Sequence, residues 1–212
     1  TPSFEIRQGS WNDLGRMAAI QRDALSLPAR EALPFLNALP RGDGAVGRAQ
    51  ALLAAWDGTM GRDLPQPLLW TEWTRRFRAA LLRARGVEDA PAGLEFLRHV
   101  LRDAEAGAFW CGGDCRAPAA VALGEAVASL QGRFGPDPAA WRWGEAHRAR
   151  FEHPLLRFVP GLARLTRLEA PVDGDGDTVR REGMRGESFL SVHGAALRFA
   201  ADLAAPGAVQ ME

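Results

Sequence analysis

Stripes of apolar residues recur every three or four positions through the first two thirds of the chain. This spacing places each stripe on one face of a helix and predicts a series of amphipathic helices. The stripes are Leu14, Met17, Ile20, Ala24 and Leu25; Val46, Ala49, Leu53 and Trp56; Trp70, Trp73, Phe77 and Leu81; Leu94, Leu97 and Leu101; and Ala120, Leu123, Val127, Leu130 and Phe134.

Residues that begin and end helices punctuate these stripes. Ser10 is a good N-cap for the first helix, with Asp13 in its first turn. Pro28 and Pro34 predict a break followed by a new helix start, residues 40–44 predict a loop, and Asp57-Gly58 and Gly86 predict helix ends.

The last third of the chain changes to a period of two residues. In residues 141–151, one face would carry Trp143, Glu145, His147, Ala149 and Phe151, and the other Arg142, Gly144, Ala146, Arg148 and Arg150. This predicts a strand with one arginine-rich face, and residues 197–203 predict a second strand. A shorter strand is predicted to start at Thr178. Helices followed by strands indicate an α+β fold, with a helical region over 1–135 and a mainly β region over 136–212.

Composition narrows the classes of function. The chain has 212 residues, of which 47% are apolar, and its 26 acidic and 26 basic side chains give a net charge of zero. This balance argues against nucleic-acid or membrane-surface binding, which needs an excess of cations. Apolar runs are too short for a transmembrane helix, and we see no signal-peptide pattern. Every cation is an arginine and there is no tyrosine, so lysine nucleophiles and tyrosine acids are excluded.

Seven tryptophans raise the question of an aromatic ligand site. Trp56, Trp70 and Trp73 lie on the helical stripes, so we interpret them as core residues of packed helices. The alternative is a non-enzymatic helical module that binds a partner through a tryptophan-rich surface. The exposure of these side chains separates the two interpretations.

Two local motifs suggest sites without satisfying their requirements. Cys111 and Cys115 lack the further ligands of a zinc site, and either a small disulfide loop or two reduced thiols fits the sequence. Asp173, Asp175 and Asp177 match the first acids of a calcium loop, but Thr178 and Met184 stand where that loop needs glycine and glutamate. We therefore predict a turn leading into a strand.

No catalytic constellation emerges from the histidines and hydroxyls. We expect His147 to be half-buried and bonded across the sheet, and His99 to be solvated. Ser191, which His193 follows in Ser191-Val192-His193-Gly194, is not in the glycine-framed elbow of a serine hydrolase. Thr1 could attack an amide only as a free N-terminal nucleophile, and the residues after it do not resemble the strand such a nucleophile occupies.

An ordered series of motifs resembles the C-terminal part of the β chain in the penicillin amidase (penicillin acylase) family, which belongs to the N-terminal nucleophile hydrolases. The segments that carry the resemblance are Met17-Ala18-Ala19-Ile20-Gln21-Arg22-Asp23-Ala24-Leu25-Ser26, Leu53-Ala54-Ala55-Trp56-Asp57-Gly58, Trp141-Arg142-Trp143-Gly144-Glu145-Ala146-His147 followed by Phe151 and His153-Pro154, Gly174-Asp175-Gly176-Asp177-Thr178-Val179 and His193–Leu203. Ala195 and Ala196 depart from the proline and serine usual in the last of them.

The resemblance implies a fragment of an αββα sandwich: a helix-rich layer followed by antiparallel strands, both parts of one larger β-chain domain. It implies an amide hydrolase whose N-terminal serine, exposed by autoproteolysis, lies upstream of the matched segment together with the oxyanion-stabilising asparagine and any calcium ligands. We therefore assign no catalytic, cofactor-binding or metal-binding residue to this chain, and we expect it to be inactive alone.

The same resemblance implies the partners and the setting. The partners would be the remainder of the β chain and the α chain of one precursor, together with a small-molecule amide substrate, and no nucleic acid or membrane. A periplasmic or secreted location is what the family suggests. The chain begins at Thr1 without methionine, which is typical of a processed or excised product.

Overall fold

The computed structural model describes residues 13–87, 93–159, 161–186, 188–195, 197–202, 205 and 209–211. These residues fall into two compact units. The helical unit comprises Leu27–Thr59 and Asp63–Trp143, and the sheet unit comprises the described residues up to Ser26, Met60–Arg62 and those from Gly144 onward. Whether 1–135 and 136–212 belong to one larger β-chain domain stays a prediction.

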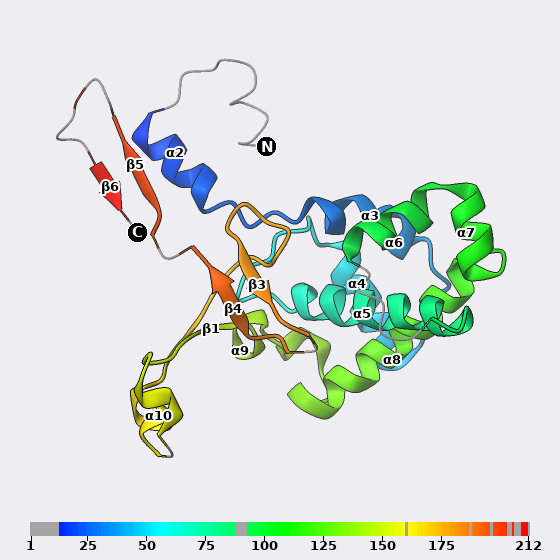
Figure 1. The fold of residues 1–212 in the computed structure, drawn as a ribbon. Helices are drawn as coiled ribbons and strands as arrows, with labels where there is room; N and C mark the ends of the chain where they lie inside the picture. Colours follow the sequence, from blue (N-terminus) through cyan, green and yellow to red (C-terminus); the bar gives the residue numbers. More distant parts are fainter. Residues whose placement is uncertain are drawn as a thin grey trace. The chain divides into compact units, whose positions relative to one another are not determined.

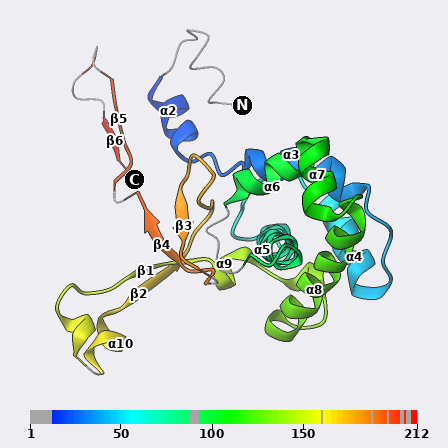
Figure 2. The same ribbon diagram turned by 45° about the vertical axis from the view of Figure 1, so that its right-hand side comes forward.

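The helical unit is a bundle built around one central helix. Figure 2 looks almost along α5 (Gln66–Ala84), and the other helices of the unit surround it. Those helices are α3 (Leu27–Asn37), α4 (Gly44–Ala54), α6 (Leu94–Arg102), α7 (Ala104–Cys111) and α8 (Arg116–Phe134), with the short 3-10 helix η1 (Pro138–Ala140) after them.

Helix α5 is central because it buries side chains around most of its circumference. Trp73 is 1% exposed, stacks on Phe77 with ring centroids 5.2 Å apart, and donates its indole N–H to the Ala119 carbonyl of α8 over 3.1 Å. The buried face of α8 includes Ala122 and Ala126, whose small side chains allow the two helices to pack closely. The predicted helical stripes over α4, α5, α6 and α8 are confirmed.

Three details of the helix prediction were wrong. Pro34 lies inside α3, because Leu33 and Leu36 are buried there and this packing outweighs the missing backbone hydrogen bond. Helix α2 (Leu14–Gln21) ends before Leu25, at Arg22. The N-cap of α2 is Asp13, which accepts from the Arg16 backbone N–H over 2.8 Å, whereas Ser10 lies outside the described residues. Helix α7 had no predicted counterpart.

The sheet unit contains helix α2 and the strands, most of which form a small mixed sheet (Figure 1). Its elements are α9 (Trp143–Ala146), which starts at the last residue of the helical unit, then β1 (Arg148–Phe151), η2 (Leu156–Phe158), α10 (Leu162–Thr166), β2 (Leu168–Pro171), β3 (Glu182–Met184), β4 (Ser191–Gly194), β5 (Phe199–Ala201) and β6 (Val209–Met211).

The four-stranded sheet has the order β2-β1-β4-β3, and β5 pairs separately with β6. Strand β1 is antiparallel to β2, and β3 is antiparallel to β4. Strands β1 and β4 run parallel, pairing Ala149 with Ser191, so the expectation of antiparallel strands is wrong for this central pair. The α+β class is confirmed.

Two predicted strands are shorter than the alternation suggested. Residues 141–147 do not form a strand: the backbone N–H of Trp143 donates to Leu64, and that of Gly144 donates to Arg62, so these groups are not available for a ladder. The alternation there reflects the complete burial of Trp141 and Trp143 rather than a pleat. Within 197–202, the described part of the second predicted strand, only Phe199–Ala201 (β5) is a strand. The residues from Thr178 to Arg180 form a turn, and the strand begins at Glu182.

Candidate functional site

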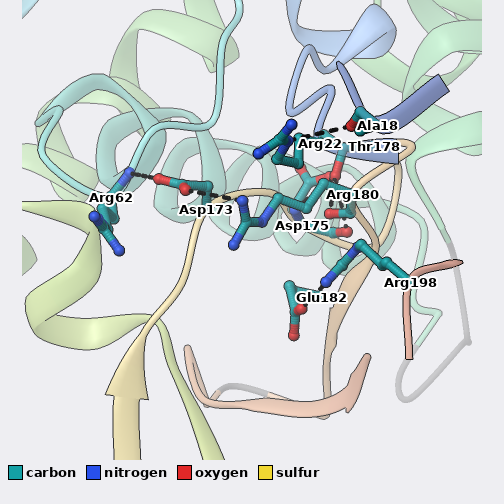
Figure 3. A network of polar contacts seen from close by, with 9 residues as sticks. All are labelled: Ala18, Arg22, Arg62, Asp173, Asp175, Thr178, Arg180, Glu182 and Arg198. Atoms are coloured by element: carbon teal, nitrogen blue, oxygen red, sulfur yellow. Dashed lines mark hydrogen bonds and ion pairs between the residues drawn. The ribbon is translucent and has the colours of Figure 1, made fainter. Parts of the chain in front are cut away.

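Polar side chains gather where the acidic loop between β2 and β3 meets two distant parts of the sheet unit (Figure 3). The Gly174 N–H donates to the Met60 carbonyl over 2.7 Å, and the Arg180 N–H donates to the Asp23 carbonyl over 2.8 Å. The Asp173 carboxylate accepts from the Arg62 N–H over 2.8 Å. The loop therefore ties together segments that are far apart in the sequence.

Gly174 makes the sharp turn of this loop. Its φ of +90° lies in the region that favours glycine, and a Cβ there would collide with the Arg180 carbonyl oxygen. The same Cβ would stand 2.9 Å from the Thr178 hydroxyl oxygen. Only glycine fits this position without displacing the backbone that follows.

The acidic side chains of the loop have different surroundings. Asp173 pairs with Arg180 over 3.4 Å. Asp175 is buried, and its Oδ1 accepts from the Asp177 N–H over 2.8 Å. Burial raises the pKa of Asp175 to about 7, and hydrogen bonds from the Asp177 and Thr178 backbone oppose this rise. This carboxyl therefore changes its charge near neutral pH.

A second buried carboxylate lies on β3. Glu182 accepts from the Ser191 hydroxyl over 2.7 Å, and Arg198 lies 3.4 Å from its other oxygen. Gly194 leaves the space for this carboxylate, because a Cβ at that position would collide with Oε2 of Glu182. The Glu182 side chain on β3 thus contacts Ser191 and Gly194 on β4, and these side-chain contacts reinforce the register of the two strands.

The polar network therefore stabilises the fold of the sheet unit. The named carboxylates bind arginines, backbone amides or a hydroxyl of their own unit, and the loop leads into β3 as predicted. Among the described residues, no group of three or more His, Cys, Asp or Glu side chains is placed to hold a metal ion.

Among the described residues, the histidines and hydroxyls singled out from the sequence have separate contacts, although Ser191 and His193 share β4. His147 is completely buried rather than half-buried, and its Nδ1 donates to the Phe189 carbonyl over 2.7 Å. His99 is exposed, as expected. Ser191 bonds Glu182, and His193 is exposed on β4. Thr1 lies outside the described residues.

Cys111 and Cys115 form a disulfide, which resolves the alternative that the sequence left open. Cys111 is the last residue of α7, and Cys115 precedes α8. The bond closes the turn that contains Gly112 and Gly113, both of which have positive φ. It joins two helices of the bundle covalently.

The tryptophans are mainly core residues. Trp56, Trp70 and Trp73 are at most 6% exposed, and Trp141 and Trp143 are completely buried. The interpretation of the first three as core residues is confirmed. Five buried indoles cannot form the tryptophan-rich surface that the partner-binding alternative requires.

Comparison with known proteins decides the family. The family model described as "Penicillin amidase" matches residues 6–211, almost the whole chain. The chain belongs to the penicillin amidase family. Residues of this penicillin amidase chain are also 31% identical, over 191 residues, to the penicillin acylase 2 proenzyme of Pseudomonas sp. (strain SE83). That match covers 79% of this chain and 23% of the relative.

The penicillin amidase chain thus spans less than a quarter of the length of this curated relative. Within the described residues, no helix combines the length and the apolar content that crossing a membrane requires. The resemblance from ordered motifs is confirmed as a family assignment. Three of those motifs contribute to the polar network: the 174–179 loop, the segment that contains Arg22 and Asp23, and the His193–Leu203 segment that contains Arg198.

Sequence reasoning missed the polar network itself. Arg62 and Glu182 belong to no recognised motif, and Arg198, although it lies in the His193–Leu203 motif, gave no sign of its pairing with Glu182. The sequence holds a weak signal of this network: Gly174 and Gly194 lie in acidic or polar segments where neither glycine ends a helix. Such glycines indicate close approach of another chain segment.

Proposed function

We propose that this chain is the C-terminal segment of the β chain of a penicillin-amidase-like hydrolase. The parent enzyme cleaves the amide bond of acylated small molecules, such as the side chain of a β-lactam or the acyl chain of an acyl-homoserine lactone. The observation that carries the proposal is the family match over residues 6–211. The coverage of 23% of a relative named as a proenzyme supports a role as one part of a larger precursor.

In the proposed reaction, a serine hydroxyl at the start of the β chain attacks the amide carbonyl. The amine leaves with a proton, an ester to the serine remains, and water hydrolyses that ester to a carboxylic acid. Hydrogen-bond donors stabilise the oxyanion in both steps. The serine and the oxyanion donors are supplied from outside this chain, and we expect no cofactor or metal ion to be held by it.

The role of the present residues is to support that reaction centre. The Asp175 and Glu182 contacts hold the acidic loop and β3 in a single arrangement, and α5 and α8 form a rigid bundle. Preorganised catalytic groups need such rigid surroundings, because small displacements strongly reduce rates.

The experiment compares two proteins on one chromogenic phenylacetyl amide. The full-length precursor that contains this chain should self-cleave and hydrolyse the amide, and the purified 212-residue chain should not. A precursor without the serine that starts the β chain serves as the matched control. Turnover of the amide by the isolated chain would refute the proposal. Failure of the self-cleaved precursor to hydrolyse any amide in a panel of acylated amines would also refute it.

We also propose a periplasmic or secreted location for the enzyme, and the Cys111–Cys115 disulfide supports it. Disulfides form and persist in oxidising compartments such as the periplasm and the cell exterior. The Cys111–Cys115 bond is consistent with folding there, together with the rest of the precursor.

A further inference from the structure

The segment between β1 and β2 carries a concentration of exposed apolar side chains. We call residues 151–159 and 161–168 the apolar arm; it contains η2 and α10 and is the yellow projection of Figure 1. The most exposed members are Phe151 (62%), Leu155 (74%), Phe158 (73%), Leu165 (81%) and Leu168 (70%).

The base of the arm is held firmly by its own strands. Phe151 pairs with Leu168 and Arg150 pairs with Glu169 in the β1–β2 ladder. Glu169 lies 2.8 Å from the Arg150 guanidinium and 3.1 Å from that of Arg167. Opposite charges on facing strand positions stabilise such a pair.

The arm also has internal order. The Nδ1 of His153 accepts from the backbone N–H groups of Leu155 and Leu156, over 3.2 and 3.1 Å, and so begins η2. The Thr166 hydroxyl donates to the Leu162 carbonyl within α10. A segment with fixed backbone and bare apolar side chains differs from a solvated loop, whose exposed residues are polar.

Contiguous exposed apolar side chains on a soluble fold mark an interaction surface. Val121 on α8 gives a contrast: it is 63% exposed but lies on a helix whose apolar stripe is buried. Single exposed residues of that kind are ordinary.

We propose that the apolar arm docks onto polypeptide of the same precursor that lies outside this chain. This inference rests on the proposed function. The relative that matches this chain is more than four times longer than the matched part, because the match covers 23% of it, so a large surface of one precursor is available to cover the arm.

A membrane is a poorer occupant. Peripheral membrane binding requires a longer helix with its apolar side chains on one face, whereas α10 has five residues and the exposed side chains are spread over η2, α10 and both strands. Arg167 pairs with Glu169 at the base of the arm, and Arg157 and Arg164 outnumber Glu152 in the remainder. The covering surface should therefore be apolar and edged by carboxylates.

Thiol labelling tests the proposal in the full-length precursor after self-cleavage. The chain contains two cysteines, joined in the disulfide, so Leu165→Cys introduces a distinctive thiol. Val121→Cys is the matched control, with similar exposure outside the arm. The rate of reaction with a maleimide is measured in the native enzyme and in urea, with the parent precursor subtracted.

The expected result is that the Leu165→Cys thiol reacts on the order of tenfold or more slowly in the native enzyme than in urea. The Val121→Cys thiol should react at similar rates in both. Equal reactivity of the two thiols in the native enzyme would overturn the proposal. Protection that disappears on dilution would assign the arm to a second copy, and protection only with anionic phosphatidylglycerol vesicles would assign it to a membrane; either also overturns it.

Hydrolysis of the phenylacetyl amide is measured on the same samples. An active enzyme with a reactive Leu165→Cys thiol would refute the docking of the arm and leave the proposed function intact. A self-cleaved enzyme inactive toward the amide panel, with a protected thiol, would refute the proposed function alone.

Discussion

The Asp175→Asn substitution should remove a pH-dependent loss of stability. Asparagine keeps the shape of the side chain and can still accept the 2.8 Å hydrogen bond from the Asp177 N–H, but it carries no charge. In the native chain, burial raises the pKa of Asp175 from 3.8 to about 7. The native state therefore favours the protonated carboxyl, whereas the unfolded state releases this proton at lower pH.

The sign and size of the effect follow from proton linkage. Where the native state binds more protons than the unfolded state, the free energy of unfolding falls as the pH rises. The contribution of Asp175 is complete below pH 3.8 and is lost as the pH rises through about 7. At about 1.4 kcal/mol for each pKa unit, the rise corresponds to a loss of up to about 4 kcal/mol.

The assay is urea unfolding of the 212-residue chain and of Asp175→Asn between about pH 4 and pH 9. The variant should gain stability relative to the parent chain progressively across this interval. Asp57→Asn is the matched control, because exposed Asp57 makes the same kind of bond, to the Thr59 N–H over 2.8 Å. A difference between Asp175→Asn and the parent that does not change with pH, or that changes in the opposite direction, would refute the reasoning.

Two further predictions concern the loop and the disulfide. Gly174→Ala should destabilise the chain by about 3 kcal/mol or more, because φ at this position is +90° and the added Cβ would meet the Arg180 carbonyl. Gly176→Ala is the control and should be tolerated, because nothing lies within 4 Å of its added Cβ. Thermal unfolding of both variants checks this, and equal melting temperatures would contradict it. Replacing both Cys111 and Cys115 by serine should cost about 2 kcal/mol in urea unfolding, since the bond closes a short loop, and an unchanged midpoint would show that the turn is equally restricted without it.

The helical part of the fold could be predicted from the sequence because its signals are local. The stripe from Trp70 to Leu81 lies on α5, and Gly86 follows the end of that helix. Both signals can be read from neighbouring residues alone. Residues 141–147 show the limit. Their alternation is typical of a strand, but the backbone N–H groups of Trp143 and Gly144 bond Leu64 and Arg62, and no local pattern reveals such partners.

The polar network was beyond prediction for the same reason. Asp175 and Glu182 look like surface acids in the sequence, and only the folded chain shows them buried. The family could nevertheless be recognised, because an ordered series of short motifs can be read from the sequence without knowledge of individual contacts. The activity stays a proposal.

The ladder between β1 and β2 separates the apolar arm from the rest of the sheet unit. Phe151 and Leu168, the first and last residues of the arm, pair with each other in this ladder, so the two ends of the arm are held together by β1 and β2. We expect the strand order β2-β1-β4-β3 to persist when the residues between them are lengthened, shortened or replaced. Evolution can thus vary this projection independently of the sheet, and a protein engineer could exchange it for a tight two-residue turn without redesigning the core.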